Sequence, residues 1–171
     1  MISTQEHQEK AKKQYPHVEC AIITVSDTRT ETNDTSGQAI RDLLTRDGHP
    51  VTYYSILKDE PKQIVAAIES LVTKPDAGCI LLNGGTGIGK RDSTVEAVAG
   101  LLEKTLVGFG ELFRMLSFAE IGSAAMMSRA VAGVYHGKLV FCMPGSTHAV
   151  NLAMEKLILP ELAHLVWELK K

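Results

Sequence analysis

An apolar run that stops abruptly in closely spaced glycines constrains the fold of this chain more than any other feature. Residues 77–82 are apolar or small, and glycines follow at positions 84, 85, 87 and 89. A basic pair and Asp92 come next, and Ser93 with Glu96 has the pattern of a capping box, which predicts a helix start. We therefore expect a buried strand, a glycine loop and a helix in succession.

Such a loop presents bare backbone N–H groups beside the positive end of a helix dipole, which suits an anion and above all a phosphate. Glycine tolerates positive φ and lets a ligand approach the main chain closely. A glycine turn between a strand and a helix is also a common joint without any ligand. Four glycines together with Thr86, a Lys-Arg pair and an aspartate exceed what a joint requires, so the residues favour a ligand site.

Two nucleotide-binding patterns match this loop incompletely. Residues 84–90 fit the first seven positions of the Walker A pattern, but Arg91 stands where Ser or Thr is needed to hold magnesium. The dinucleotide fingerprint G-x-G-x-x-G also fails, because Lys90 replaces its third glycine. A P-loop kinase or NTPase therefore stays an alternative only on the partial Walker match.

Composition narrows the class of protein. The chain has 171 residues, 44% hydrophobic and 22% charged, which is ordinary for one globular domain. A net charge of -2 gives no basic field, so we expect no nucleic-acid partner. No apolar run approaches the ~20 residues of a membrane span, so we expect no membrane partner.

The two ends of the chain differ in character. Residues 1–17 are polar and are expected to be a mobile or partly helical extension, without the apolar stretch of a secretory signal, before a single domain at 18–171. Cys20, Cys79 and Cys142 lie within apolar runs and show no metal-site spacing, so we expect buried thiols in a reducing cytoplasm.

The rest of the chain alternates strands with amphipathic helices. Strands are expected at 20–25, 51–57, 77–82, 131–135 and 139–143, the last two forming a hairpin. Helices are expected at about 35–45, with Thr35 and Gln38 as a capping box, and at 61–72, 95–102, 111–118 and 122–129, with 106–110 as a connector. A last helix follows Ser146 and is kinked or restarted at Pro160. This order predicts a three-layer α/β/α sandwich with a mostly parallel sheet and a small antiparallel hairpin.

In such a sheet the carboxyl ends of the parallel strands meet at one edge, where ligands bind. The segments at these ends are Ser26-Asp27, Lys58-Asp59, the glycine loop, and Pro144-Gly145-Ser146. Asp92 is either a helix-dipole charge or a magnesium ligand, and its position after the basic pair favours metal or nucleotide contact. Asp59 or Glu60 is equally well explained as the N-cap of the helix beginning at Pro61. Glu96 is assigned to its capping box.

These segments resemble a known family when taken together. They include the motifs VSDTR (25–29), DTSG (34–37), NGGTG (83–87), RD (91–92), GFGE (108–111), FRMLSF (113–118), SRAVAG (128–133) and MPGS (143–146). In this order they are similar to those of the MoaB/MogA family of molybdenum cofactor biosynthesis proteins, with the later motifs closest to its MoaB branch. The resemblance extends over residues 20–169.

The resemblance implies a molybdopterin-binding domain that assembles as a trimer or hexamer. Active relatives adenylylate molybdopterin with ATP and Mg²⁺, release pyrophosphate, and pass the product to metal insertion, which makes a downstream metal-insertion protein a further partner. By position, Asp59 and Asp92 match the catalytic, magnesium-associated aspartates. Gly84, Gly85, Thr86 and Gly87 match the phosphate loop, and Ser26, Asp27, Ser128, Pro144, Gly145 and Ser146 fall in ligand-lining segments.

Two positions depart from the adenylyltransferase pattern. Val95 occupies the place of a common proline, and Asn83 that of a frequent threonine. Neither change removes a catalytic group. An oligomer that binds molybdopterin or a precursor without turnover is the alternative, because some members of the MoaB branch keep the pocket without adenylylating.

Overall fold

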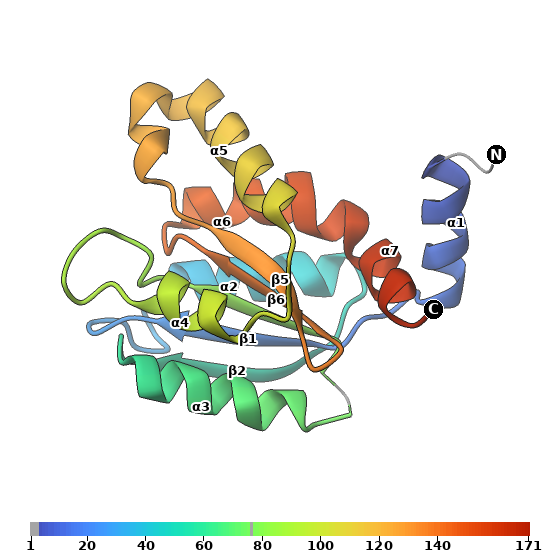
Figure 1. Cartoon of the computed structure of the whole chain (residues 1–171), viewed down its shortest axis with the longest axis horizontal. Coiled ribbons are helices and arrows are strands. Elements are labelled where there is room, and N and C mark those ends of the chain that lie inside the picture. Colours follow the sequence, from blue (N-terminus) through green and yellow to red (C-terminus); the bar gives the residue numbers. More distant parts are fainter. Residues whose placement is uncertain (1–3, 76) are drawn as a thin grey trace.

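Six strands form one sheet in the part of the chain that the computed structural model describes, residues 4–75 and 77–171 (Figure 1). The order across the sheet is β2-β1-β3-β6-β5-β4. Strands β2, β1, β3 and β6 run parallel, while β5 pairs antiparallel with β6 and with β4. The strands are β1 (Cys20–Val25), β2 (Val51–Leu57), β3 (Cys79–Asn83), β4 (Lys104–Thr105), β5 (Val131–Tyr135) and β6 (Lys138–Met143).

Helices cover both faces of the sheet, because the central strands are apolar on both sides. In β1, Cys20 and Ile22 face one core, whereas Ala21, Ile23 and Val25 face the other. The first core is covered by α2 (Thr35–Arg46), α5 (Val107–Ile121), α6 (Thr147–Ala153) and α7 (Leu159–Leu169); the second is covered by α3 (Pro61–Val72) and α4 (Thr94–Leu101). The predicted three-layer sandwich is confirmed.

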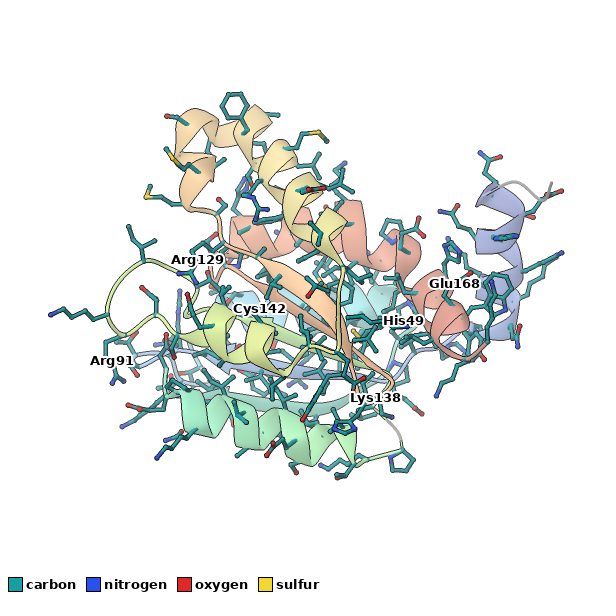
Figure 2. All side chains as sticks on the ribbon, viewed as in Figure 1. His49, Arg91, Arg129, Lys138, Cys142 and Glu168 are labelled. Atoms are coloured by element: carbon teal, nitrogen blue, oxygen red, sulfur yellow. The ribbon has the colours of Figure 1, made fainter. Side chains whose placement is uncertain are left out.

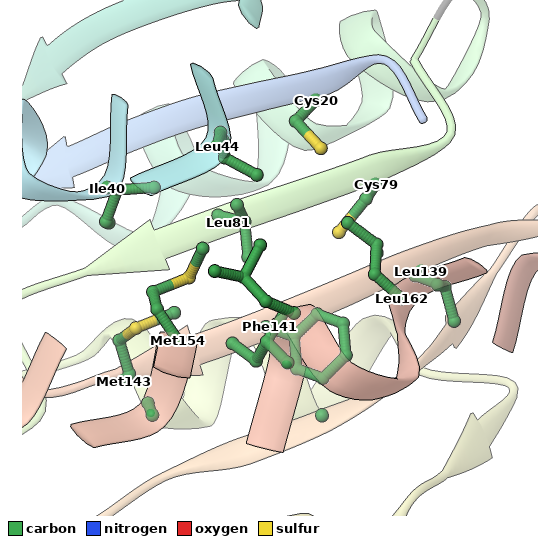
Figure 3. Close-up of a cluster of buried hydrophobic side chains, with 14 of the residues drawn as sticks. Cys20, Ile40, Leu44, Cys79, Leu81, Leu139, Phe141, Met143, Met154 and Leu162 are labelled. Carbon is green, nitrogen blue, oxygen red and sulfur yellow. The ribbon is translucent and has the colours of Figure 1, made fainter. Parts of the chain in front are cut away.

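The larger core includes the buried side chains of Leu81, Leu139, Phe141, Met154 and Leu162 (Figure 3). Phe141 of β6 packs edge-to-face on Phe109 of α5, with ring centroids 5.1 Å apart. Cys20, Cys79 and Cys142 are free and buried, as expected. Burial of Cys142 in the second core raises the pKa of its thiol well above the usual range, so the thiol stays neutral.

The N-terminal segment forms helix α1 (Thr4–Gln14), which packs against α7, and its Ala11 is fully buried. The segment was expected to be mobile or partly helical, and the structure shows a helix from Thr4 onward. Residues 1–3 lie outside the described part. Among the described residues, no helix is long and apolar enough to cross a membrane.

Three local predictions were wrong. Helix α2 is capped by Asp34, whose carboxylate accepts from the Gly37 amide at 3.0 Å, and not by a Thr35–Gln38 box. The carboxylate is preferred because it is buried and accepts four bonds at once. Residues 106–110 are mostly the first turn of α5, and the short edge strand β4 before it was missed, since two residues carry no periodicity. Residues 122–127 form a 3₁₀-helix (Gly122–Met127), tighter than expected.

The C-terminal helix is interrupted as predicted. A single π-helical stretch, Met154–Ile158, separates α6 from α7, and Pro160 lies in the first turn of α7. Proline is tolerated there because the first N–H groups of a helix have no intrahelical acceptor.

Candidate functional site

The carboxyl ends of the four parallel strands meet at one edge of the sheet. Val25 of β1 is in register with Leu57 of β2, and Asn83 of β3 with Met143 of β6. The segments that follow these strands therefore emerge side by side, as predicted. They are residues 26–27, 58–59, 84–92 and 144–146, and they bring together Asp27, Asp59, Asp92 and the glycine loop.

Glycine is required at the start of the loop by both conformation and space. Gly84 and Gly85 have φ of +94° and +62°. A Cβ added to Gly84 would lie 2.2 Å from the Val25 carbonyl oxygen, so the loop presses against the end of β1. The Gly84 amide donates to the Met143 carbonyl at 3.1 Å, which ties the loop to the end of β6.

The loop amides fall into two sets. Those of Gly84 and Gly89 are engaged, the second by the Asp92 carboxylate at 2.9 Å. Within the described part of the chain, the amides of Gly85, Thr86 and Gly87 are among those that donate to no protein acceptor. These three consecutive donors are the ones that the anion-binding interpretation requires.

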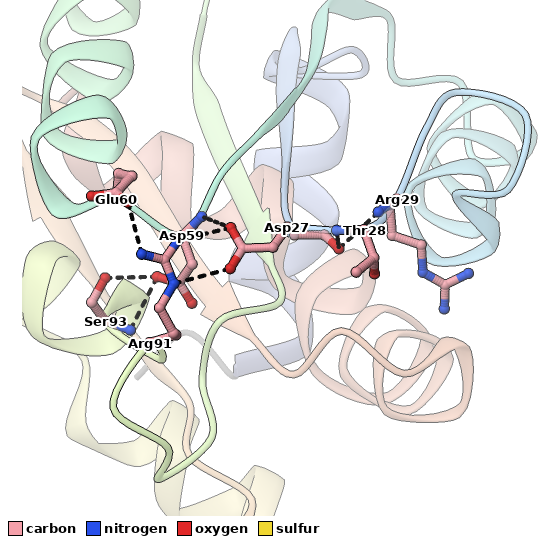
Figure 4. Close-up of polar contacts among 8 residues, drawn as sticks. Asp27, Thr28, Arg29, Asp59, Glu60, Arg91 and Ser93 are labelled. Atoms are coloured by element: carbon pink, nitrogen blue, oxygen red, sulfur yellow. Dashed lines mark hydrogen bonds and ion pairs between the residues drawn. The ribbon is translucent and has the colours of Figure 1, made fainter.

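Asp59 lies beside the loop and is only 6% exposed. Its Oδ1 accepts from the Ser93 amide at 3.1 Å and from the Ser93 hydroxyl at 2.6 Å (Figure 4). Its Oδ2 faces Gly85, where an added Cβ would lie 2.4 Å away. Asp59 therefore caps α4 from another element, and Ser93 makes no side-chain bond to its own helix. The predicted Ser93–Glu96 capping box is wrong, because the Asp59 carboxylate is a stronger hydrogen-bond partner for the Ser93 hydroxyl than a backbone amide of α4 would be.

Thr94 completes a cradle that sequence reasoning missed. Its hydroxyl oxygen is buried and has no hydrogen-bond partner among the described residues, while an added Cβ on Gly85 would lie 2.2 Å from it. The absent side chain of Gly85 thus leaves room between Asp59 Oδ2 and Thr94 Oγ1. A buried, unpartnered hydroxyl is costly unless a ligand satisfies it. Its sequence signal was weak, since a threonine at a helix start is common.

Asp92 contacts the later part of the loop, at Gly87 and Gly89. Besides accepting from Gly89, its Oδ2 faces Gly87, where an added Cβ would be 2.6 Å away. Glu96 does not turn back on its own helix but pairs with Arg129, which also donates to the Gly87 carbonyl at 3.2 Å. One of the two carboxylates that the sequence singled out therefore lies at Gly85 and the other at Gly87, and Arg129 also holds the loop.

Arg91 connects three of these segments. Its guanidinium donates to both carboxylate oxygens of Asp27, at 3.1 and 3.0 Å, and to Glu60 at 2.8 Å (Figure 4). The hydrogen bond from Arg91 lowers the pKa of Asp27, and a bond from the Asp59 amide adds to this effect. Arg91 thus anchors the exit of the loop, and Asp27 has its oxygens occupied by protein.

The serines of the site are placed differently from one another. The Ser26 hydroxyl accepts from the Thr28 and Arg29 amides and shapes its own turn. Ser146 caps α6 by accepting from the Ala149 amide at 3.2 Å. Ser128, Pro144 and Ser146 line a cavity of about 250 Å³ next to the loop, and Ser26 is not among its lining residues. Gly145 packs on Gly84. A Cβ added to Gly145 would lie 2.9 Å from the Gly84 Cα.

A buried polar network supports the edge from beneath. The Asp34 carboxylate, 3% exposed, accepts from Thr24, Tyr54, Ser36 and the Gly37 amide. Burial raises the pKa of Asp34, but these four bonds together outweigh it and the pKa lies below its ordinary value. Asn83 joins the network through Thr24 and Ser36. The only sign of this network in the sequence was a polar residue, Asn83, at the end of an apolar run.

Known proteins share both the sequence and the fold. A family model described as a probable molybdopterin binding domain matches residues 21–164. The chain belongs to this family. The molybdenum cofactor biosynthesis protein B of Bacillus cereus is 54% identical over 171 residues, covering 99% of both chains, and that of Bacillus subtilis is 50% identical over the same span and coverage.

Solved structures agree with this membership. A crystal structure of a molybdenum cofactor biosynthesis protein B superposes with a TM-score of 0.88 at 56% identity, covering 90% of this chain and 96% of that one. The tungsten cofactor synthesizing protein MoaB from Pyrococcus furiosus gives a TM-score of 0.83 at 34% identity, covering 91% and 98%. The MoaB/MogA resemblance is confirmed, and the chain is a molybdenum cofactor biosynthesis protein of the MoaB branch.

Proposed function

We propose that this protein binds molybdopterin and adenylylates it with ATP and Mg²⁺, releasing pyrophosphate. The observation that carries the proposal is the loop at 85–87: its three amides have no acceptor within the described part of the chain, and the carboxylates of Asp59 and Asp92 lie at Gly85 and Gly87. Unpaired amides in a glycine loop bind phosphate oxygens, and two acids beside them suit a divalent ion. The names of the relatives support the pathway but do not specify this reaction.

The chemistry needs positioning and charge neutralisation more than a covalent enzyme intermediate. A terminal phosphate oxygen of molybdopterin attacks the α-phosphorus of ATP and forms a new P–O bond. The bond from the α-phosphorus to the bridging oxygen breaks, and pyrophosphate leaves with that electron pair. In this scheme the amides of Gly85, Thr86 and Gly87 hold the phosphate oxygens, and Lys90, which is exposed at the loop, adds positive charge.

The residues present fit the implied magnesium. Asp59 Oδ2 and the unpartnered Thr94 hydroxyl are oxygen ligands that share the space at Gly85, and Asp92 Oδ2 lies near Gly87. Mg²⁺ prefers one or two carboxylates together with substrate phosphates. We assign Asp59 and Asp92 to holding it, with Thr94 as a further oxygen. The ion would neutralise charge on the phosphates.

The cavity of about 250 Å³ beside the loop supports an assignment of the pterin end of the substrate. Ser128 and Ser146 provide hydroxyls in its wall, and Pro144 provides an apolar surface. A mostly apolar cavity with a few polar groups is the usual form of a site for a ring system. We assign Ser26 and Asp27 supporting roles at this edge of the sheet: Ser26 shapes the turn after β1, and Asp27 holds Arg91.

The proposal is tested by incubating the purified protein with molybdopterin, ATP and Mg²⁺ and measuring pyrophosphate and adenylylated pterin. Asp92→Asn and Asp59→Asn should lower the rate at least a hundredfold. Glu69→Gln is the matched control, because it removes an exposed carboxylate from α3, outside the site. Tight pterin binding by the wild type without pyrophosphate release would instead identify a binding module. Loss of all nucleotide binding in Lys90→Ala would favour a P-loop enzyme.

We also propose that the chain self-associates as a trimer or hexamer through the outer surface of α5 and the 3₁₀-helix after it. Large apolar side chains concentrate there, and all are more than 45% exposed: Val107, Leu112, Met115, Phe118, Ile121, Met126 and Met127. An apolar surface of this extent on a soluble domain is typical of a protein interface. The adenylylation proposal also includes delivery of the adenylylated molybdopterin to a downstream metal-insertion protein.

A further inference from the structure

Helices α1 and α7 bring three metal-ligating side chains together at a place that the proposed reaction does not use. His7 of α1 and His164 and Glu168 of α7 have ligand atoms that all lie within 4.8 Å of one another. Glu168 lies at the opposite end of the molecule from Arg91 and Arg129, which mark the glycine loop (Figure 2). Within the described residues, this is the one group of three or more such side chains.

The spacing of two of the ligand atoms is close to that of ligands on one small ion. His164 and Glu168 are four positions apart on α7 and so lie on the same helix face. His164 Nε2 and Glu168 Oε1 are 3.6 Å apart, which is long for a hydrogen bond. Two ligands about 2.1 Å from one tetrahedral zinc ion would lie about 3.4 Å apart. The observed separation is therefore close to that of two ligands sharing an ion.

A second carboxylate orients His164. The Glu161 Oε2 lies 2.9 Å from His164 Nδ1, which we assign as the protonated nitrogen, leaving the Nε2 lone pair on the side of Glu168. Histidines that bind metals usually donate their other N–H to a carboxylate in this way. Glu161 is itself held by Gln8 of α1. The orienting group thus also links the two helices.

His7 is placed by aromatic contacts. Its ring meets the Trp167 ring edge-on, with centroids 5.4 Å apart, and the His164 ring edge-on at 6.3 Å. His7 and His164 are both partly buried, so their rings have limited freedom to turn away. Lys171 pairs with Glu168 at 2.5 Å and is the cation that an ion would have to displace or share.

We propose that His7, His164 and Glu168 form a site for one divalent transition-metal ion of the zinc class, which clamps the N-terminal helix onto α7. Two imidazoles and one carboxylate are ligands for Zn²⁺ and its neighbours, whereas Mg²⁺ and Ca²⁺ prefer oxygen alone. Three protein ligands leave a fourth position for water. The site is separate from the magnesium proposed at Asp59 and Asp92 and does not depend on the adenylylation.

The test is calorimetric titration of Zn²⁺ into the full-length, tag-free protein after treatment with EDTA. We expect one ion per chain. His164→Ala should weaken binding at least a hundredfold, and Glu161→Gln, which leaves all three ligands in place, should weaken it about tenfold through loss of the orienting bond. His136→Asn is the matched control, since it removes an exposed histidine outside the group.

A second measurement is needed because a variant could lose zinc binding simply by losing the packing of α1. It follows thermal unfolding and amide exchange with and without Zn²⁺. Saturating Zn²⁺ should raise the Tm of the wild type by about 5–10 °C at a hundredfold excess over Kd, and should slow amide exchange in α1. His7→Ala should show neither effect, while its circular dichroism stays native. Absence of binding to the wild type, or binding and protection unchanged in both His7→Ala and His164→Ala, would overturn the proposal.

Discussion

Ser93 donates two hydrogen bonds to the carboxylate of Asp59, one from its amide at 3.1 Å and one from its hydroxyl at 2.6 Å. The junction of β2 and α3 thereby caps α4, the helix that follows the glycine loop. The same carboxylate turns its other oxygen toward Gly85. A single acid therefore has a structural oxygen and an oxygen available to a ligand, and variants can separate these two roles.

Asp59→Asn should keep most of the stability but lose activity, because an amide oxygen still accepts from Ser93 while the negative charge for a divalent ion is gone. Asp59→Ala should lose both, with a cost of about 1–2 kcal/mol in the free energy of unfolding, as for a lost helix cap. Urea unfolding and pyrophosphate release measure the two effects. Equal stability of both variants would contradict the capping role of Asp59.

Gly85→Ala should lower both stability and activity, because the new methyl group would lie 2.2 Å from Thr94 Oγ1 and 2.4 Å from Asp59 Oδ2 at a φ of +62°. We expect a loss of roughly 1–3 kcal/mol. Gly100→Ala, in α4 where an added Cβ meets nothing within 4 Å, should instead stabilise by roughly 0.5–1 kcal/mol. Thermal unfolding checks both, and effects of equal sign would refute the steric account.

Arg91→Gln should raise the pKa of Asp27 toward its ordinary value of 3.8, because the main cause of the lowered pKa is the hydrogen bond from Arg91. Both side chains are exposed, so little change in stability is expected. Substrate affinity should fall, since the exit of the loop loses its anchor. An NMR titration of the Asp27 carboxyl carbon gives the pKa, and a value unchanged in the variant would contradict the assignment.

The buried Asp34 should make stability depend on pH. Its folded pKa is lowered, so its contribution is fully present above the unfolded value of 3.8 and is lost as the pH falls through the folded pKa. Asp34→Asn should therefore be less stable than the wild type at neutral pH by about 1–3 kcal/mol, with the difference shrinking in acid. Urea unfolding at a series of pH values measures this, and a constant difference would show that Asp34 acts through packing alone.

Met126→Glu should reduce the molar mass measured by light scattering, because Met126 is 80% exposed within the apolar surface of α5 and the 3₁₀-helix. Burying an unpaired carboxylate in an interface is strongly unfavourable. Ile88→Ser is the control, since Ile88 is 76% exposed but lies on the glycine loop, outside that surface. An unchanged mass in Met126→Glu would place any interface elsewhere.

Much of this protein follows from its sequence because the signals are local. Period-2 and period-3.6 patterns, together with Gly, Pro and Asp at element ends, were sufficient for the three-layer sandwich and the hairpin. They also placed Asp59, Asp92 and the glycine loop at one edge of the sheet. A parallel sheet brings its strand ends together whatever the details of the loops.

The partners of the side chains were decided only by the tertiary structure. Ser93 bonds to Asp59 instead of its own helix, Glu96 pairs with Arg129, and Asp34 instead of Thr35 caps α2. Ser93 and Glu96 take partners distant in sequence, and at α2 the buried Asp34 is preferred over its neighbour Thr35, because hydrogen bonds to a charged carboxylate are stronger than those of a neutral local cap. The cradle at Thr94 and the His7–His164–Glu168 group likewise exist only once separate elements pack together, and no local pattern encodes that packing.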